Sequence, residues 1–573
     1  MYPLGEHFKI NVNPIANDSN VIKGQKYRIT ILSENLVRFE FSPSGNFLDA
    51  ATELAWNRDF GPAKFEKKED DNILQITTSY FKINYVKEKN FSGSKMAPDA
   101  NLKVSMVGTE GYWYYGNPEV KNLGTSGNEL NGKNSKEKGL YSLDGFVSID
   151  DSKSKVLLED GTYEDRNFSE IDVYLFVYRK DFTLCLKNYF ALTGNPPLIP
   201  RFALGNWWSK NLAYKEKDIK KLIEQFGKKR IPLSVFLLDN DWHIRQNNLE
   251  TGFTFHKELF PNPTSLIDYL HKNSIQIGLG VNPTEGFLPI DDVYKHSIQY
   301  LQADSKGVIP FDVLNPRWID VYFKIYIHPL DNLHVDFYWV KTNNKITREQ
   351  LRMLQHYQTY DKTKNLENRP LILSEFSGMC SHRYPVLYSG KQKISWETLK
   401  AIPYHNLQAT NAGISWWAHD IGGYYQGIEE SELYIRFVQL GVFSPILKFG
   451  SDASKYYKRE PWKWDVKTYS ITREYLNLRH QLIPYLYSLA YNYHKNGQPL
   501  LRPLYYENEN LIDDLRFRNQ YYLGKELLVC PITSRKDSVM DRSIQQMYIP
   551  PGTWYDFVTG KKFPGNKEYT FVE

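Results

Sequence analysis

Two stretches of the sequence place carboxylates beside flat aromatic side chains, directly after apolar runs. Asp239 and Asp241 follow the run LSVFLL, and Asp420 follows Trp416 and Trp417 in WWAHDIGG. Carboxylate oxygens accept hydrogen bonds from hydroxyl groups, and indole faces stack on the apolar faces of sugar rings. A single Asp after a strand is more often a helix N-cap or a turn residue. Two such stretches at the same end of one sheet, however, would form a carbohydrate subsite.

The elements that carry these residues are apolar strands that alternate with amphipathic helices. Window 216–229 has Ile219, Ile223 and Phe226 at helical spacing. Near-continuous apolar strands between helices predict a parallel sheet that is buried on both faces. Seven or eight units in about 290 residues fit a (β/α)8 barrel, whose functional side chains gather at the carboxyl ends of the strands. The strand-like runs, taken as strands one to seven, are FALGNWW (202–208), LSVFLLD (233–239), QIGLGV (276–281), HVDFYWV (334–340), RPLILS (369–374), GISWWA (413–418) and SPILKF (444–449).

Regions of a different pattern flank the barrel. In residues 1–196, short β-type runs with frequent Gly, Asn and Asp predict an N-terminal β-sandwich. The proline-rich LTGNPPLIP is interpreted as the linker to a barrel over 197–490, and renewed β-type runs predict a C-terminal β-domain over 491–573. The chain ends soon after the strand-like EYTFVE, and an incomplete last domain is one interpretation of that end.

The composition excludes several functional classes. The 573 residues carry a net charge of only +5 without long runs of like charge, so neither nucleic acid nor a membrane is expected as a partner. Cys185, Cys380 and Cys530 form no CxxC pair, which excludes a disulfide framework and a cysteine zinc site. The first residues, MYPLGEHFKINV, lack the basic and apolar regions typical of a signal peptide, and no apolar run approaches the roughly 20 residues that span a bilayer. We expect a cytoplasmic protein, and the 15% aromatic content favours a sugar as ligand.

Seven motifs occur in order along the chain: IPRFALGNWWS, LDNDWH, F-T-F-x-K-E-L-F-P (253–261), SHRYPVLYSG (381–390), WETL (396–399), HDIGG (419–423) and F-x-Q-L-G-x-F-S-P (437–445). Together they resemble glycoside hydrolase family 31, the family of α-glucosidases and α-xylosidases, and the resemblance extends from about residue 150 to about residue 560. It implies an N-terminal β-sandwich, a barrel and C-terminal β-domains. It also implies retaining cleavage of α-glycosides by two Asp residues, a nucleophile and an acid/base, with no metal or other cofactor.

At both catalytic positions that the resemblance implies, this sequence has a lysine. Lys341 stands at the nucleophile position in VDFYWVKTNN, and Lys391 stands at the acid/base position in SHRYPVLYSGKQ. A lysine, with an ordinary pKa of about 10.4, is a cation at neutral pH and cannot form a glycosyl ester. Near a cation-like transition state, exchanging an attracting for a repelling charge at about 4 Å costs roughly 8 kcal/mol at an effective dielectric of about 20. We therefore expect no catalytic residue.

The resemblance also implies a set of sugar-contacting positions. Asp239 and Asp420 match the family pattern, and Trp417 lies close to Asp420 in the sequence. Four other positions depart from the pattern: Glu375 and Lys448 replace arginines, and Tyr424 and Phe449 replace histidines. The expected ligand-contacting set is Asp239, Asp420, Trp417, Glu375 and Phe449, with no metal ligand.

Three interpretations of the lysines stay open. Lys341, Lys391 and Glu375 can form an internal ion-pair cluster in the old sugar subsite, since each has the opposite charge to its family counterpart. The lysines can instead bind an anionic ligand, such as a sugar phosphate or a sugar acid. A lysine with a lowered pKa can also form a Schiff base.

The sequence as a whole therefore predicts a catalytically inactive member of the family. Its expected partners are a carbohydrate or anionic sugar ligand and, through protein contacts, a second copy of the chain or an active paralogue. The alternative is a working retaining glycosidase of the α-glucosidase type.

Overall fold

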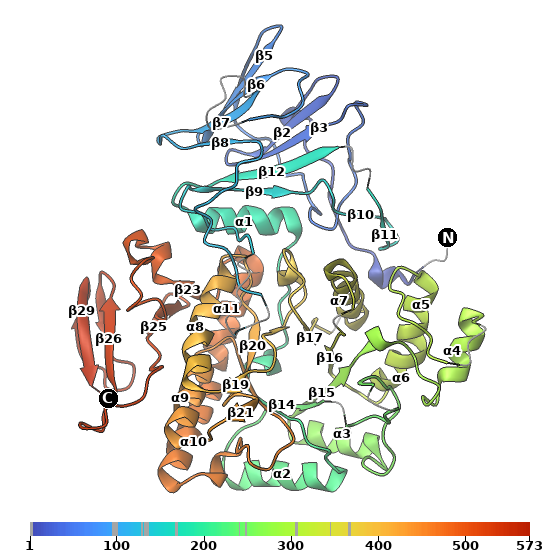
Figure 1. Cartoon of the computed structure of the whole chain (residues 1–573), viewed down its shortest axis with the longest axis vertical. Helices are drawn as coiled ribbons and strands as arrows, with labels where there is room; N and C mark the ends of the chain where they lie inside the picture. The colour runs from blue at the N-terminus through green and yellow to red at the C-terminus, as the bar shows by residue number, and fades with distance from the viewer. Residues whose placement is uncertain are drawn as a thin grey trace.

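The computed structural model has three parts in chain order: an N-terminal β-sandwich, a barrel and a C-terminal group of β-strands (Figure 1). This confirms the predicted fold class. The structure describes residues 4–93, 101–127, 130, 137–166, 170–239, 241–246, 249–303, 307–343, 345–364 and 368–572.

The sandwich consists of two five-stranded antiparallel sheets, whose inner faces share one apolar core. Alternation along the strands explains this packing: Phe81, Ile83 and Tyr85 are buried, whereas the residues between them face outward. The first sheet has the order β1 (Val21–Lys23), β2 (Tyr27–Ser33), β3 (Leu36–Phe41), β12 (Ile171–Val177) and β9 (Phe146–Asp150). The second has the order β4 (Glu66–Glu69), β5 (Ile73–Thr77), β6 (Phe81–Val86), β7 (Leu102–Met106) and β8 (Tyr112–Tyr114). A short pair, β10 (Val156–Leu157) and β11 (Tyr163–Glu164), lies beside them.

The barrel contains eight parallel strands. In order around the barrel they are β13 (Asn206–Lys210), β14 (Val235–Leu238), β15 (Gln276–Val281), β16 (Phe337–Val340), β17 (Ile372–Leu373), β18 (Leu387–Tyr388), β20 (Trp417–Ile421) and β22 (Ile446–Ser451). A parallel bridge between Ser374 and Leu387 joins β17 to β18 and closes the ring. The sixth strand, β18, was missed in the sequence, so GISWWA and SPILKF belong to the seventh and eighth strands.

Helices cover the outside of the barrel. They are α2 (Glu216–Lys228), α3 (Pro263–Lys272), α4 (Tyr294–Leu301), α5 (Pro316–Val321), α6 (His328–Asp331), α7 (Arg348–Lys362), α8 (Trp396–Thr410), α9 (Ser431–Val442), α10 (Val466–Gln481) and α11 (Ile483–Asn496). Their buried residues recur at helical spacing, as in α2 with Ile219, Ile223 and Phe226. Among the described residues, no helix has both the length and the apolar character that crossing a membrane requires.

The loop between β17 and β18 joins the barrel to the sandwich. Arg383 donates hydrogen bonds to the carbonyl oxygens of Thr193 (3.0 Å) and Glu53 (2.7 Å), and its guanidinium lies 4.1 Å from the ring centre of Trp56. The hydroxyl of Tyr189, on α1 (Phe182–Thr193), accepts a hydrogen bond from the backbone of Cys380. The SHRYP segment (381–385) therefore braces the barrel against the N-terminal part of the chain.

The C-terminal strands pack beside α8 and α11 (Figure 1). They form a three-stranded sheet of β23 (Leu501–Pro503), β24 (Tyr521–Leu523) and β25 (Leu527–Val529), and two pairs, β26 (Ile544–Ile549) with β29 (Lys567–Val572) and β27 (Thr553–Tyr555) with β28 (Lys562–Pro564).

Candidate functional site

The first part of the candidate site is an ion pair at the ends of β14 and β16. Asp239 follows β14, Lys341 follows β16, and the Lys341 ammonium contacts Oδ1 of Asp239. The side chain of Asp239 is 2% exposed and that of Lys341 is 12% exposed. Trp339 lies two residues before Lys341 on the same face of the chain, and its ring centre is 4.5 Å from the Lys341 Nζ. The ammonium of a partly exposed lysine side chain thus lies close to both a carboxylate and an indole.

Gly280, on the intervening strand β15, explains why Lys341 reaches Asp239. A Cβ atom at Gly280 would lie 3.2 Å from Cε of Lys341 and 3.1 Å from the carbonyl oxygen of Asp239. A larger side chain at this position would press on the lysine stem, whereas glycine leaves the path across β15 open. The second Gly of QIGLGV is therefore part of the site.

The second part is an ion pair inside the barrel, between β20 and β22. Asp420 and Lys448 are directly opposite in the register of these strands, and the Lys448 ammonium donates to Oδ1 of Asp420. Both side chains are fully buried. The hydroxyl of Tyr388, from β18, donates to the other carboxylate oxygen of Asp420. The Lys448 Nζ also lies 4.7 Å from the ring centre of Tyr388 and 5.2 Å from that of Trp339.

Glycine is again required beside this pair. A Cβ atom at Gly450 would lie 1.9 Å from Oδ1 of Asp420 and 3.0 Å from Nζ of Lys448. Gly450 and Lys448 are alternate residues of β22 and so face the same side, the barrel interior. The close packing holds the Asp420 carboxylate against Lys448.

The electrostatic surroundings of Lys341 act in two directions. Burial lowers the pKa of the Lys341 ammonium well below its usual value, and the positive charges of Lys391 and Lys448 lower this pKa further. The contact with the Asp239 carboxylate opposes them, because an adjacent anion favours the charged form. Burial and the two neighbouring cations thus favour the neutral form of Lys341, whereas the contact with Asp239 favours its charged form.

Glu375 and Lys391 lie at the rim of this group. Oε2 of Glu375 accepts a hydrogen bond of 3.0 Å from the hydroxyl of Thr342, and burial raises the pKa of the Glu375 carboxyl. Lys391 is exposed, and its Nζ lies 5.0 Å from the ring centre of Tyr424. In the described part of the chain no carboxylate is within ion-pair distance of Lys391.

The expected cluster of Lys341, Lys391 and Glu375 is therefore not formed. Lys341 has Asp239 as its carboxylate partner, since Gly280 leaves the direct path between them open. Glu375 instead bonds to Thr342, and Lys391 lies on Tyr424.

Three other candidate residues lie apart from these ion pairs. Trp417 faces the helix layer, where its ring centre is 4.5 Å from that of His405 on α8, on the opposite side of β20 from Asp420. Phe449 likewise faces outward, 6.4 Å from the ring of Tyr434 on α9. Asp241 pairs with Arg245 at 2.9 Å. The candidate positions are therefore split between the barrel interior, the helix layer and a surface turn.

Trp339 and Tyr388 contribute to the site but were not singled out in the sequence. Trp339 could have been found, because alternation along HVDFYWVK puts it on the same face as Lys341. Tyr388 gave no such signal, because the two-residue strand β18 was not recognised.

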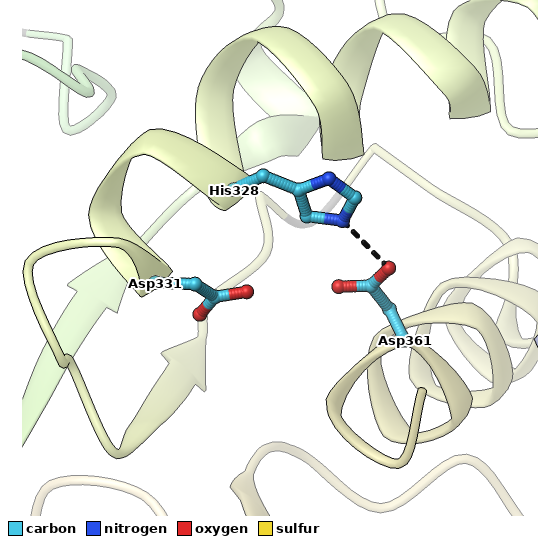
Figure 2. A group of neighbouring side chains, drawn as sticks. All are labelled: His328, Asp331 and Asp361. Carbon is cyan, nitrogen blue, oxygen red and sulfur yellow. Dashed lines mark hydrogen bonds and ion pairs between the residues drawn. The ribbon is translucent and has the colours of Figure 1, made fainter. Parts of the chain in front are cut away.

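A cluster with metal-ligand residue types lies away from the barrel mouth, between α6 and α7. Figure 2 shows His328, Asp331 and Asp361, with a 2.9 Å hydrogen bond between Nε2 of His328 and Oδ1 of Asp361. Lysines already occupy the carboxylates: Lys364 Nζ lies 2.9 Å from Asp331 and 3.0 Å from Asp361, and Lys362 lies 2.7 Å from Asp331. A cation would have to displace these ammonium groups, so the cluster serves as an ion-pair network.

This network also anchors the N-terminal segment. Nε2 of His7 lies 3.1 Å from the same Asp361 oxygen that contacts His328. Burial raises the pKa of Asp361, but the hydrogen bonds to His328 and His7 lower this pKa below its usual range. Asp361 thus contacts His7, which lies 354 positions earlier in the chain.

A closed parallel barrel with carboxylates at its strand ends, between an N-terminal β-sandwich and C-terminal strands, defines a barrel protein with the architecture of glycosidases. The chain belongs to glycosyl hydrolase family 31. The family's TIM-barrel domain matches residues 196–489, and its C-terminal domain matches residues 497–573.

Curated relatives include an α-xylosidase of Saccharolobus solfataricus, which is 27% identical over 74% of this chain and 59% of its own length. Another is α-glucosidase 2 of Bacillus thermoamyloliquefaciens, 26% identical over 69% of this chain and 54% of its own length. The chain thus spans somewhat more than half the length of these relatives.

Solved structures share the fold. A family 31 dextranase of Flavobacterium johnsoniae, complexed with glucose, aligns with a TM-score of 0.73 at 20% identity, over 97% of this chain and 77% of its own. An α-xylosidase from a soil metagenome, complexed with xylose, aligns with a TM-score of 0.71 at 17% identity, over 96% of this chain and 95% of its own.

Proposed function

We propose that the chain is a family 31 member without glycosidase activity, which binds a carbohydrate-related anion at the mouth of its barrel. In this proposal Lys341 occupies the position of the nucleophile and Lys391 that of the acid/base. The observation that carries it is the Lys341–Asp239 ion pair, which puts an ammonium group at the end of the fourth strand.

Retaining hydrolysis needs two carboxyl groups roughly 5–5.5 Å apart, one of them free to attack the anomeric carbon. The Asp239 and Asp420 carboxylates are instead bound by Lys341 and Lys448. A cation near the reacting carbon also repels a cation-like transition state, by about 4 kcal/mol at 4 Å and an effective dielectric of about 20. Each roughly 1.36 kcal/mol is a tenfold loss of rate. These effects together support a lack of hydrolysis.

The charges at the mouth support an anionic ligand. The charges within each of the two ion pairs cancel. Lys391, by contrast, is exposed and lies near the Tyr424 ring. An ammonium on an aromatic face keeps its outer side free for an anion such as a phosphate. Two solved relatives hold glucose and xylose, respectively, which supports a sugar as the rest of the ligand.

The proposed contacts follow from the geometry. Lys391 would bind the anionic group, and Asp239 and Glu375 would offer carboxylate oxygens toward sugar hydroxyls. Asp420 is left out, because it is fully buried and both of its oxygens are bound by Lys448 and Tyr388. We leave Trp417 and Phe449 out of the contact set, because both face the helix layer.

Isothermal titration with glucose 1-phosphate, glucose 6-phosphate and glucose tests this proposal. We expect the phosphates to bind more tightly than glucose, and both Lys391→Met and Asp239→Asn to weaken binding. Lys228→Met is the matched control, since Lys228 is an exposed lysine on α2, 67% exposed. No heat from any of the three compounds, or equal weakening by Lys228→Met, would overturn the proposed ligand.

The rival function is an active α-glycosidase, which the named activities of the relatives favour. It predicts release of nitrophenol from p-nitrophenyl α-xyloside or α-glucoside by the pure protein. Release that persists in Lys341→Met and Lys391→Met but disappears when another carboxylate is changed would establish this rival.

A further inference from the structure

Three lysines surround Trp339 and Tyr424, but only Lys341 combines a carboxylate partner with exposure. Lys448 is fully buried and bound to Asp420. Lys391 is exposed but has no carboxylate partner among the described residues. Lys341 contacts Asp239 and its side chain is 12% exposed, so it meets solvent beside a built-in proton acceptor.

We propose that Lys341 forms a reversible imine with the aldehyde carbon of an open-chain reducing sugar. The proposal deepens the function above, since it rests on a sugar reaching the barrel mouth. It names a covalent ligand class, an aldose with a free carbonyl group, that simple binding does not require.

The step balances within the Lys341–Asp239 pair. The ammonium gives one proton to the Asp239 carboxylate, and the free amine attacks the aldehyde carbon, so that a C–N bond forms. Asp239 passes two protons, one after the other, from the lysine nitrogen to the carbonyl oxygen. The oxygen then leaves as water. The nitrogen retains one proton, and the product is a protonated imine beside an ionised Asp239. No oxidant or reductant is needed.

The surroundings suit both ends of this step. A lysine that is desolvated and near other cations is the kind that acts as a nucleophile at neutral pH. Lys341 meets those conditions, because its burial and the charges of Lys391 and Lys448 lower its pKa. The protonated imine has the same charge as the ammonium it replaces, so the Asp239 ion pair and the contact with the Trp339 ring, 4.5 Å from Nζ, are retained.

The experiment uses two sugar phosphates that differ in one respect. Glucose 6-phosphate can open to an aldehyde, whereas the anomeric carbon of glucose 1-phosphate is blocked. The full chain is incubated with each and with cyanoborohydride, which reduces an imine to a stable amine, and peptides are then mapped by mass spectrometry. A trapped adduct adds the mass of one glucose 6-phosphate less one oxygen atom.

We expect glucose 6-phosphate to label the Lys341 peptide at least tenfold more than any other lysine peptide, saturably, and glucose 1-phosphate to label none. Asp239→Asn should reduce the labelling at least tenfold, and Lys228→Met should leave it unchanged. Mapping the unaltered protein keeps the test decisive if Asp239→Asn does not fold.

The two proposals fail differently. Calorimetric binding of either phosphate without preferential labelling of Lys341 would refute the imine and leave the proposed function standing. Labelling spread evenly over surface lysines would likewise refute the imine. An absence of both binding and labelling would overturn both proposals.

Discussion

Replacing Lys448 by Met removes the ammonium from a buried ion pair. Lys448 and Asp420 are both 0% exposed, and the other hydrogen bond to this carboxylate from a described residue comes from Tyr388. A charge left buried without its partner costs about 3–5 kcal/mol. Met has a similar length and no charge, so little of this loss comes from a cavity. We expect Lys448→Met to lower the free energy of unfolding by about 3–5 kcal/mol.

Urea unfolding, followed by tryptophan fluorescence, measures this loss against two controls. Lys391→Met removes an exposed ammonium and should change the unfolding free energy by less than about 0.5 kcal/mol. The double variant Lys448→Met/Asp420→Asn should recover much of the loss, because replacing a whole buried pair is often neutral. Equal stability of Lys448→Met and Lys391→Met would refute the reasoning, as would a double variant no more stable than Lys448→Met.

Three further outcomes follow from the same contacts. Gly450→Ala should lower the melting temperature and weaken sugar phosphate binding by calorimetry, because its Cβ would lie 1.9 Å from Asp420; an unchanged melting temperature would contradict the packing. Lys341→Asp/Lys391→Asp should gain nitrophenol release from p-nitrophenyl α-xyloside over the unaltered protein, since two carboxylates enter the site; no gain would count against these two positions. Asp361→Asn should cost about 1–3 kcal/mol in unfolding at pH 7. Its lowered pKa means that this difference is present above about pH 4 and shrinks as the pH falls, as parallel urea titrations would show.

The barrel could be predicted because its long strands leave a simple pattern. Runs such as QIGLGV (276–281) are apolar and buried from their second residue onward, as expected of strands between the barrel interior and a helix layer. Leu387–Tyr388 left no such pattern, since two residues are too few to show a period. Its neighbours fix it instead, through the bridge between Ser374 and Leu387.

The site was predicted in part. Asp239 and Asp420 lie at strand ends, as their place after apolar runs indicates. The direction of Phe449 could have been derived, since Lys448 and Phe449 are adjacent on one strand and must face opposite sides. The partner of Lys341 could not have been derived from the sequence. The contact with Asp239 depends on an open path over Gly280, which belongs to a strand distant in the sequence.

The ion pairs also decide which ligand chemistry the mouth can favour. A neutral sugar offers hydroxyl groups, which would compete with the ammonium groups of Lys341 and Lys448 for the oxygens of Asp239 and Asp420. Hydroxyl donors replace a charged donor poorly, because hydrogen bonds to charged groups are stronger when both partners are charged. A phosphate or an aldehyde engages the lysines themselves and leaves the carboxylates paired. Affinity should therefore follow the lysines, so that phosphate binding weakens as salt screens the exposed Lys391.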